Sequence, residues 1–219
     1  ADLVITAVKT DPSQKHRGMS LLVLERGMDG FERGRNLEKV GLHAQDTAEL
    51  FFTDVHVPVT NLLGEEGQGF VHLVHNLPQE RLSIAASGVA AARAALGWTL
   101  EYAKTRQAFG QPIGAFQSIK HRIAELYGLV ELARANCIHA ASREGQSDFV
   151  TAAAAARLSA TEAYDTAARD CVQIHGGIGV TWEIGLHLHM RRARTLALEQ
   201  GSSLFWEDIL VDRLAGEAA

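Results

Sequence analysis

The chain has 219 residues, of which 47% are hydrophobic and 21% charged, an ordinary globular composition with room for one large domain or two small ones. Its net charge of −5 and its pI near 6.1 give no reason to expect a nucleic acid or an anionic membrane surface as a partner. No apolar run reaches the length of a membrane-spanning helix. The two cysteines, Cys137 and Cys171, fit no Cys-x-x-Cys spacing, so reduced thiols are expected.

The first part of the chain has the pattern of β-strands. Short β-prone runs cover residues 3–8, 20–24 and 48–58, and residues 31–37 are a further candidate. Together they predict about half of a small antiparallel barrel or sandwich, and we assign residues 1–63 to this β-domain. The chain starts inside a strand pattern without an initiator Met, so we expect it to be the later part of something longer.

After the glycine-rich segment 64–69 the pattern becomes helical almost to the end, and we assign residues 64–219 to a helical domain. Apolar residues at helical spacing and Gly or Pro in the connections predict helices over the following segments: 70–106, 116–143, 148–173, 184–194 and 203–214. Long helices joined by short loops predict an antiparallel bundle. The alanine run 152–156 suits a close approach between helices.

The segment Leu77-Pro78-Gln79-Glu80-Arg81-Leu82 stands at the start of the first long helix. A carboxylate beside apolar residues loses hydration and becomes a stronger base, and Pro78 is expected to kink the helix and aim Glu80 into a cavity. The alternative is an exposed Glu and Arg on the first turns of a helix, the usual place for charged residues.

Two further motifs each allow two interpretations. The glycines of 175–179 follow no strand, so they fit a dinucleotide-binding fingerprint poorly; they cap a helix or let backbone NH groups approach a ligand. In the loop 105–117, Arg106, Phe109 and Gln117 offer a cation, an aromatic face and an amide to a diphosphate-bearing cofactor. The alternative is a connector whose Arg106 complements a helix C-terminus. The histidines show no ligand set, and no metal is expected.

Taken together, these segments resemble the acyl-CoA dehydrogenase family, most closely its long-chain members. The resemblance runs over essentially the whole chain and is carried by residues 41–52, 63–70, 77–82, 106–117 and 171–182. It implies a mainly α fold: a C-terminal four-helix bundle preceded by part of an antiparallel β-barrel domain. The N-terminal helical domain of the family and the start of its β-domain would be absent.

The resemblance also implies FAD-dependent α,β-desaturation of an acyl-CoA thioester and two possible positions for the catalytic base. Many members have a Glu near the C-terminus in a Glu-Gly-Thr-like segment, which here corresponds to Gln200-Gly201-Ser202, and an amide cannot take the proton. Other members place the Glu before an Arg on the first long bundle helix, which Glu80-Arg81 matches. Glu80 is therefore the expected base, and Glu199 is a distant second.

The remaining expectations also come from the resemblance. Arg81, Gln200 and Gly201 would bind substrate, with the backbone NH of Gln200 holding the thioester oxygen. The residues expected to bind FAD, partly across a subunit interface, are Arg106, Phe109, Gln117, Gln173, Gly176, Gly177, Ser202 and Leu204. Expected partners are an acyl-CoA, an electron-transfer flavoprotein as acceptor, and further copies in a homotetramer built as a dimer of dimers. The compartment would be the bacterial cytoplasm or the mitochondrial matrix. A non-catalytic oligomerisation or scaffold module and an acyl-CoA oxidase on the same fold stay open as alternatives.

Overall fold

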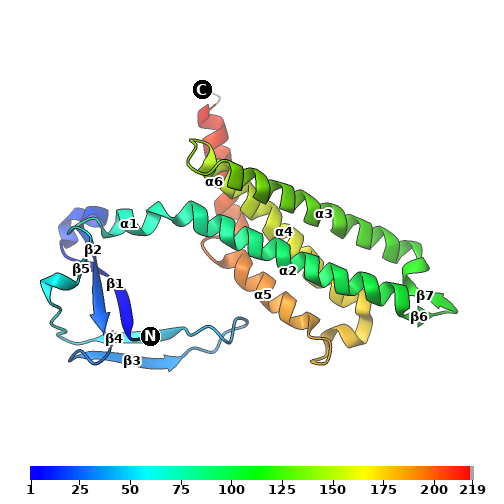
Figure 1. Cartoon of the computed structure of the whole chain (residues 1–219), viewed down its shortest axis with the longest axis horizontal. Coiled ribbons are helices and arrows are strands. Elements are labelled where there is room, and N and C mark those ends of the chain that lie inside the picture. The colour runs from blue at the N-terminus through cyan, green and yellow to red at the C-terminus, as the bar shows by residue number, and fades with distance from the viewer. Residues whose placement is uncertain (218–219) are drawn as a thin grey trace. The chain divides into compact units, whose positions relative to one another are not determined.

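A computed structural model describes residues 1–217, and the predicted fold class is confirmed: the chain is mainly helical, with small antiparallel sheets near its start (Figure 1). Contacts divide the chain into two compact units. The first comprises residues 1–39 and 43–77, and the second comprises residues 40–42 together with the chain from Pro78 onward.

The first unit holds two small antiparallel sheets. β2 (Met19–Glu25) lies between β1 (Leu3–Lys9) and β5 (Leu62–Leu63), while β3 (Phe31–Asn36) pairs with β4 (Ala48–Phe52) in a separate sheet. The strand predicted over 48–58 ends early because Asp54 has a φ of 49°, which a strand cannot accommodate. The buried hydrophobic side chains described in this unit are Leu21 and Leu24, so its core is small.

The helix predicted over 70–106 is two helices, because α1 (Gly69–His75) ends before α2 (Leu77–Thr105) begins. Between them Asn76 has φ −94° and ψ −2°. Pro78 accounts for the break, since it has no NH to donate to the carbonyl of Val74 four residues earlier, and the Asn76 NH bonds to that carbonyl instead. Pro78 itself lies in the first turn of α2, where a missing NH costs nothing. The expected kink is therefore a break, and Glu80 lies in the first turn of a new helix.

The second unit is the predicted helical bundle (Figure 1). A two-stranded hairpin, β6 (Gln107–Ala108) and β7 (Gln111–Pro112), joins α2 to α3 (Gln117–Ser142). The chain continues through α4 (Phe149–His175), α5 (Leu186–Leu198) and α6 (Ser203–Glu217). α4 contacts α3, α5 and α6, so it is the central helix of the unit.

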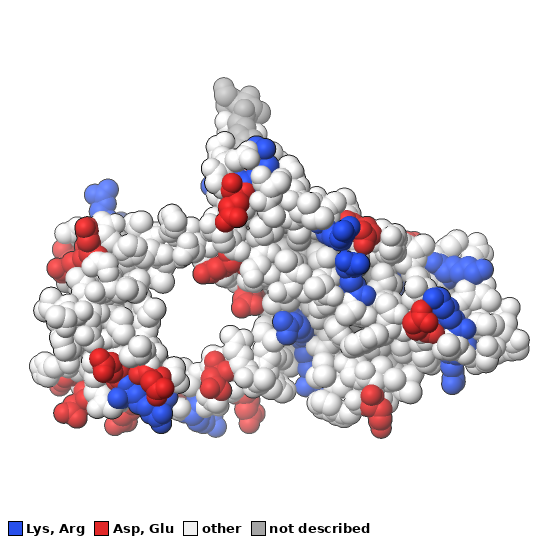
Figure 2. All heavy atoms as spheres, viewed as in Figure 1, with Lys and Arg blue, Asp and Glu red and all other residues white. Residues whose placement is uncertain are grey.

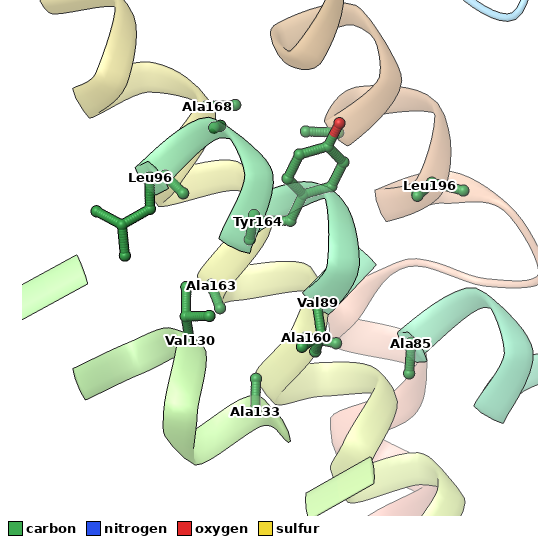
Figure 3. Close-up of a cluster of buried hydrophobic side chains, with 14 of the residues drawn as sticks. Ala85, Val89, Leu96, Val130, Ala133, Ala160, Ala163, Tyr164, Ala168 and Leu196 are labelled. Carbon is green, nitrogen blue, oxygen red and sulfur yellow. The ribbon is translucent and has the colours of Figure 1, made fainter. Parts of the chain in front are cut away.

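The bundle core consists largely of alanine. Side chains from four helices meet in it (Figure 3): Ala85, Val89 and Leu96 of α2, Val130 and Ala133 of α3, Ala160, Ala163, Tyr164 and Ala168 of α4, and Leu196 of α5. Small side chains let helix axes approach closely, as the alanine run of α4 predicts. Such a tightly packed core gives the ends of the helices, which carry the candidate site, a fixed frame.

The surface of the described residues carries charges of both signs. On the face shown in Figure 2, acidic and basic side chains are interspersed over the bundle. Within the part of the chain that the structure describes, no helix is long and apolar enough to cross a membrane.

Candidate active site

The structure brings Glu80 and Gln200 into contact, although 120 positions separate them in the sequence. Glu80 lies in the first turn of α2, and Gln200 lies in the turn between α5 and α6. Gln200 Nε2 donates a hydrogen bond of 2.6 Å to Glu80 Oε2. An amide that donates to a carboxylate over so short a distance makes a charge-assisted bond, stronger than one between neutral groups.

The turn that carries Gln200 has an unusual backbone. Gln200 has φ 57°, and Gly201 has φ 110°, a region open essentially to glycine alone. A Cβ on Gly201 would also lie 2.6 Å from Phe205 Cδ1 and 2.9 Å from Trp206 Nε1. Position 201 therefore requires glycine for two reasons: its positive φ and the close packing of α6 against it.

Trp206 fixes this turn from α6. Its side chain is 2% exposed, and its indole Nε1 donates a hydrogen bond of 3.1 Å to the backbone carbonyl of Gln200. The guanidinium of Arg81 lies over the same ring, with Cζ 4.2 Å from the ring centroid, a cation–π contact. One buried indole therefore connects the residue after Glu80 to the segment that carries Gln200.

Arg157 fixes the same turn from α4. This side chain is 2% exposed, and its Nη2 donates hydrogen bonds to the backbone carbonyls of Leu196 and Glu199, the latter at 2.8 Å. Burial lowers the pKa of Arg157, and the Glu199 carboxylate opposes that shift. A guanidinium stays protonated in proteins, so the last carbonyls of α5 face a permanent positive charge.

Arg81 is half-buried beside Glu80. Burial lowers the pKa of Arg81, while the Glu80 carboxylate raises it and Arg213 lowers it further. Arg81 Nε is buried without a hydrogen-bond partner among the described residues. Its charge and its ring contact with Trp206 make Arg81 a side chain that steadies this turn of α2.

The surroundings of Glu80 differ from those expected. The sequence predicts a carboxylate facing apolar neighbours, but Glu80 is exposed and its carboxylate meets an amide. Leu82 and Ile84 are half-buried and pack against the bundle core. These residues pack inward on the bundle and leave Glu80 exposed, so they do not exclude water from its carboxylate.

Six of the residues expected to bind FAD gather at the other end of the bundle. Tyr102 near the end of α2 stacks on His175 at the end of α4, with ring centroids 4.1 Å apart. This contact brings two helix ends and the hairpin together, and with them Arg106, Phe109, Gln117, Gln173, Gly176 and Gly177. Gly176 ends α4 with φ 66°, so the capping interpretation of this glycine cluster is confirmed.

Phe109 is 96% exposed at the tip of the hairpin. It has φ 51° and the following Gly110 has φ 82°, the two positive angles of a type I′ turn. The side chains of Arg106 and Gln117 and the backbone of Gly176 and Gly177 are exposed as well. A large aromatic ring held in solvent is suited to contact a molecule outside this chain.

The predicted site residues therefore form two groups at opposite ends of α2. Glu80 and Arg106 are separated along one straight helix by roughly 40 Å at 1.5 Å per residue. Ser202 and Leu204 belong to the Glu80 group because they adjoin Gly201, and Leu204 is 73% exposed. One dinucleotide cannot touch both groups of the same chain.

Other cavities and clusters lie away from Glu80. An apolar groove of about 640 Å³ between α2 and α3 is lined by Leu96, Leu100, Ile123 and Tyr127 among others, and by none of the predicted site residues. In the described part of the chain, no three His, Cys, Asp or Glu side chains are grouped to hold a metal ion.

Sequence reasoning missed Arg157 and Trp206. Arg157 directly follows the alanine run of α4, and a lone cation beside such a run was a usable signal of a buried charge with a specific partner. Nothing local distinguished Trp206 from an ordinary core residue of α6. Its role depends on the turn that precedes the helix, which only the structure shows.

Comparison with known proteins defines the class to which this bundle and its turn belong. Residues 67–215 match the family model of the acyl-CoA dehydrogenase C-terminal domain, which covers well over half of the chain. The chain belongs to the acyl-CoA dehydrogenase family.

Individual relatives support this assignment. The chain is 39% identical over 215 residues to the mitochondrial long-chain specific acyl-CoA dehydrogenase of Sus scrofa, an alignment that covers 96% of this chain and 50% of that protein. An acyl-CoA dehydrogenase structure from Geobacillus kaustophilus matches with TM-score 0.92 and 42% identity, over 98% of this chain and 57% of that one. A structure described as the electron transferring flavoprotein of Acidaminococcus fermentans matches with TM-score 0.91 and 35% identity, over 98% and 57% respectively. The chain spans about half the length of the curated relatives it matches.

Proposed function

We propose that the protein carrying this chain catalyses FAD-dependent α,β-desaturation of an acyl-CoA thioester, with Glu80 as the base that removes the α-proton. The observation that carries this proposal is the contact between Gln200 Nε2 and Glu80 Oε2. The resemblance implies that family members place the base at one of these two positions. Here the two positions touch, and Glu80 is the one with a carboxylate.

In this proposal the residues of the chain remove the α-proton of the substrate and stabilise the negative charge that its removal leaves. A Glu80 oxygen forms a bond to the α-proton, and the electron pair of the C–H bond moves toward the thioester carbonyl oxygen. The backbone NH of Gln200 stabilises the negative charge that develops on this oxygen. The positive φ of Gln200 and Gly201 sets the direction of the turn that carries this NH. Arg81 follows Glu80 on α2, and Gly201 follows Gln200 in the turn. Both therefore border the proposed substrate position.

The exposed groups at both ends of the bundle fit FAD. Arg106, Phe109 and the exposed backbone of Gly176 and Gly177 offer a cation, a ring and NH groups to a diphosphate and an adenine. Ser202 and Leu204 border the Glu80 group, where they would lie beside the flavin ring. FAD, when bound, would supply the acceptor for the β-hydride.

The separation of the two groups supports a homo-oligomer. The Arg106 and Glu80 groups are roughly 40 Å apart along α2. We therefore propose that the Arg106 end of one copy completes the FAD site beside Glu80 of another, in a homotetramer. Reduced flavin must then pass its electrons on, and we propose an electron-transfer flavoprotein as the acceptor, as the family resemblance implies.

The test of this function is the visible spectrum of the full-length, FAD-loaded protein before and after a long-chain acyl-CoA is added without oxygen. Bleaching of the flavin absorbance, with formation of the 2,3-enoyl thioester, is the expected result. Unchanged absorbance with a series of short, branched and long acyl-CoAs would contradict the proposal and favour a scaffold role. Rapid re-oxidation by admitted O₂ with release of H₂O₂ would favour an oxidase.

Replacing Arg106 by alanine is expected to weaken FAD binding about 10-fold or more, because an exposed cation that pairs with a diphosphate contributes roughly 1.5–3 kcal/mol. Titration of apoprotein with FAD measures the effect. The control is Arg93→Ala, which removes an exposed arginine in the middle of α2. Equal FAD affinity in the two variants would show that Arg106 serves only the end of its helix.

A further inference from the structure

We infer that Gln200 is a positioning residue for Glu80: its amide holds the ionised carboxylate in one orientation and meets it again after the proton has been taken up. This inference rests on the proposed function, in which Glu80 is the base. It concerns a side chain that does not ionise and that is 120 positions away from Glu80 in the sequence.

The contact between Gln200 and Glu80 has a definite polarity. An amide has one donor end and one acceptor end, whereas an ionised carboxylate only accepts. The Nε2 end faces Glu80 Oε2 at 2.6 Å, which is the arrangement that the ionised base requires. With the opposite orientation, two acceptor oxygens would meet, so the charge on Glu80 selects the orientation of the Gln200 amide.

The other end of the same amide has a different environment. Gln200 Oε1 is buried and has no hydrogen-bond partner among the described residues. Leaving such an oxygen unpaired costs free energy, so the bond to Glu80 holds the amide where it is against that cost. When Glu80 has taken up a proton, its hydroxyl becomes a donor, and a half-turn of the amide brings Oε1 to accept it. One side chain thereby serves both states of the base.

Two buried side chains anchor the segment that carries this amide. Gln200 has a backbone φ of 57°, a conformation that a non-glycine residue keeps only when its surroundings impose it. Trp206 Nε1 donates to the carbonyl of Gln200, and Arg157 Nη2 donates to the carbonyl of Glu199. Both anchoring side chains are 2% exposed and come from different helices. A freely solvated surface amide has no such support.

Two consequences for the reaction follow. Without the amide donor, Glu80 samples other rotamers, so the rate of proton removal falls about 10-fold while the KM for acyl-CoA changes little. Loss of a donor to the ionised form also makes protonation easier, so the acidic limb of the pH–rate profile moves to higher pH.

The experiment compares Gln200→Met and Gln200→Glu with the parent in the full-length, FAD-loaded protein. Methionine keeps the length of the side chain and removes the donor. Glutamate keeps the shape and places a second carboxylate against Glu80, so the pair shares a proton and the acidic limb moves further to higher pH. The matched control is Gln146→Met in the turn between α3 and α4, where the glutamine is exposed, and the parent profile is expected there.

A second readout does not depend on turnover. The ¹³C resonance of the Glu80 carboxyl, assigned by its loss in Glu80→Gln, is titrated in the parent and in both Gln200 variants. The midpoint is expected to rise in Gln200→Met and to rise further in Gln200→Glu. Gln200→Glu keeps the packing of the turn, so it decides the matter if Gln200→Met folds poorly.

The outcomes separate this inference from the function on which it rests. Parent-like pH profiles and parent-like Glu80 titrations in both Gln200 variants overturn the positioning role, even if Glu80→Gln is inactive. An active Glu80→Gln variant overturns the proposed base, while shifted titrations in the Gln200 variants would still establish the contact.

Discussion

Replacing Glu80 by glutamine is expected to slow acyl-CoA-dependent flavin reduction by roughly 10²–10⁴-fold, the usual contribution of a positioned general base. Glutamine has nearly the same shape, so FAD binding and folding are expected to stay unchanged. An amide cannot accept the α-proton, however, and two amides at 2.6 Å keep a hydrogen bond without a base between them. Anaerobic stopped-flow measurement of flavin bleaching gives the rate.

Glu199→Gln is the matched control for this prediction. Glu199 is exposed and directly precedes Gln200, and Arg157 holds its backbone carbonyl. Near-parent bleaching in Glu199→Gln together with loss in Glu80→Gln assigns the base to α2. The reverse pattern would move the base to the turn before α6 and sink the assignment of Glu80.

Replacing Trp206 by alanine is expected to lower the free energy of unfolding by about 3–5 kcal/mol, the range for a truncated buried aromatic side chain. The 2% exposed ring leaves a cavity, Arg81 loses its ring contact, and the carbonyl of Gln200 loses a donor. Trp206→Phe keeps most of the ring and removes the NH, so a loss of about 0.5–1.5 kcal/mol is expected. Urea unfolding followed by far-UV circular dichroism measures both.

Trp182→Ala separates burial from residue type, because Trp182 is 71% exposed. A change of about 0.5 kcal/mol or less is expected for this surface substitution. Similar losses for Trp182→Ala and Trp206→Ala would mean that Trp206 contributes no more than an exposed ring, and the connection between α2 and the turn would then lose its support.

Much of the fold was predictable because its signals are local. Helical spacing of apolar residues located α3, α4, α5 and α6 within a few residues of their observed bounds. The alanine run 152–156 predicted close helix packing, and the core confirms it. The break at Asn76 was missed because apolar spacing continues across it, whereas the missing NH of Pro78 interrupts the helical hydrogen bonds.

The candidate site was predictable only as a list of positions. The motif around Glu80 pointed to that carboxylate, and the segment 200–202 pointed to the turn before α6. Their contact could not be derived, because it depends on how the two ends of a long chain pack and on two positive φ angles. The predicted apolar setting of Glu80 was wrong for this chain, since Glu80 is exposed in the first turn of α2 and its carboxylate meets the Gln200 amide.

The contact between positions 80 and 200 also constrains how such a sequence can evolve. A lineage that moved its carboxylate from α2 to the turn before α6 would have to pass through one of two single-substitution intermediates. With glutamine at both positions the proposed base is lost, and selection would remove the variant. With glutamate at both, two carboxylates lie within hydrogen-bond distance and share a proton, which weakens the base near neutral pH but keeps it. The intermediate that keeps a base is therefore the one with glutamate at both positions. A relative that carries both carboxylates would represent such an intermediate.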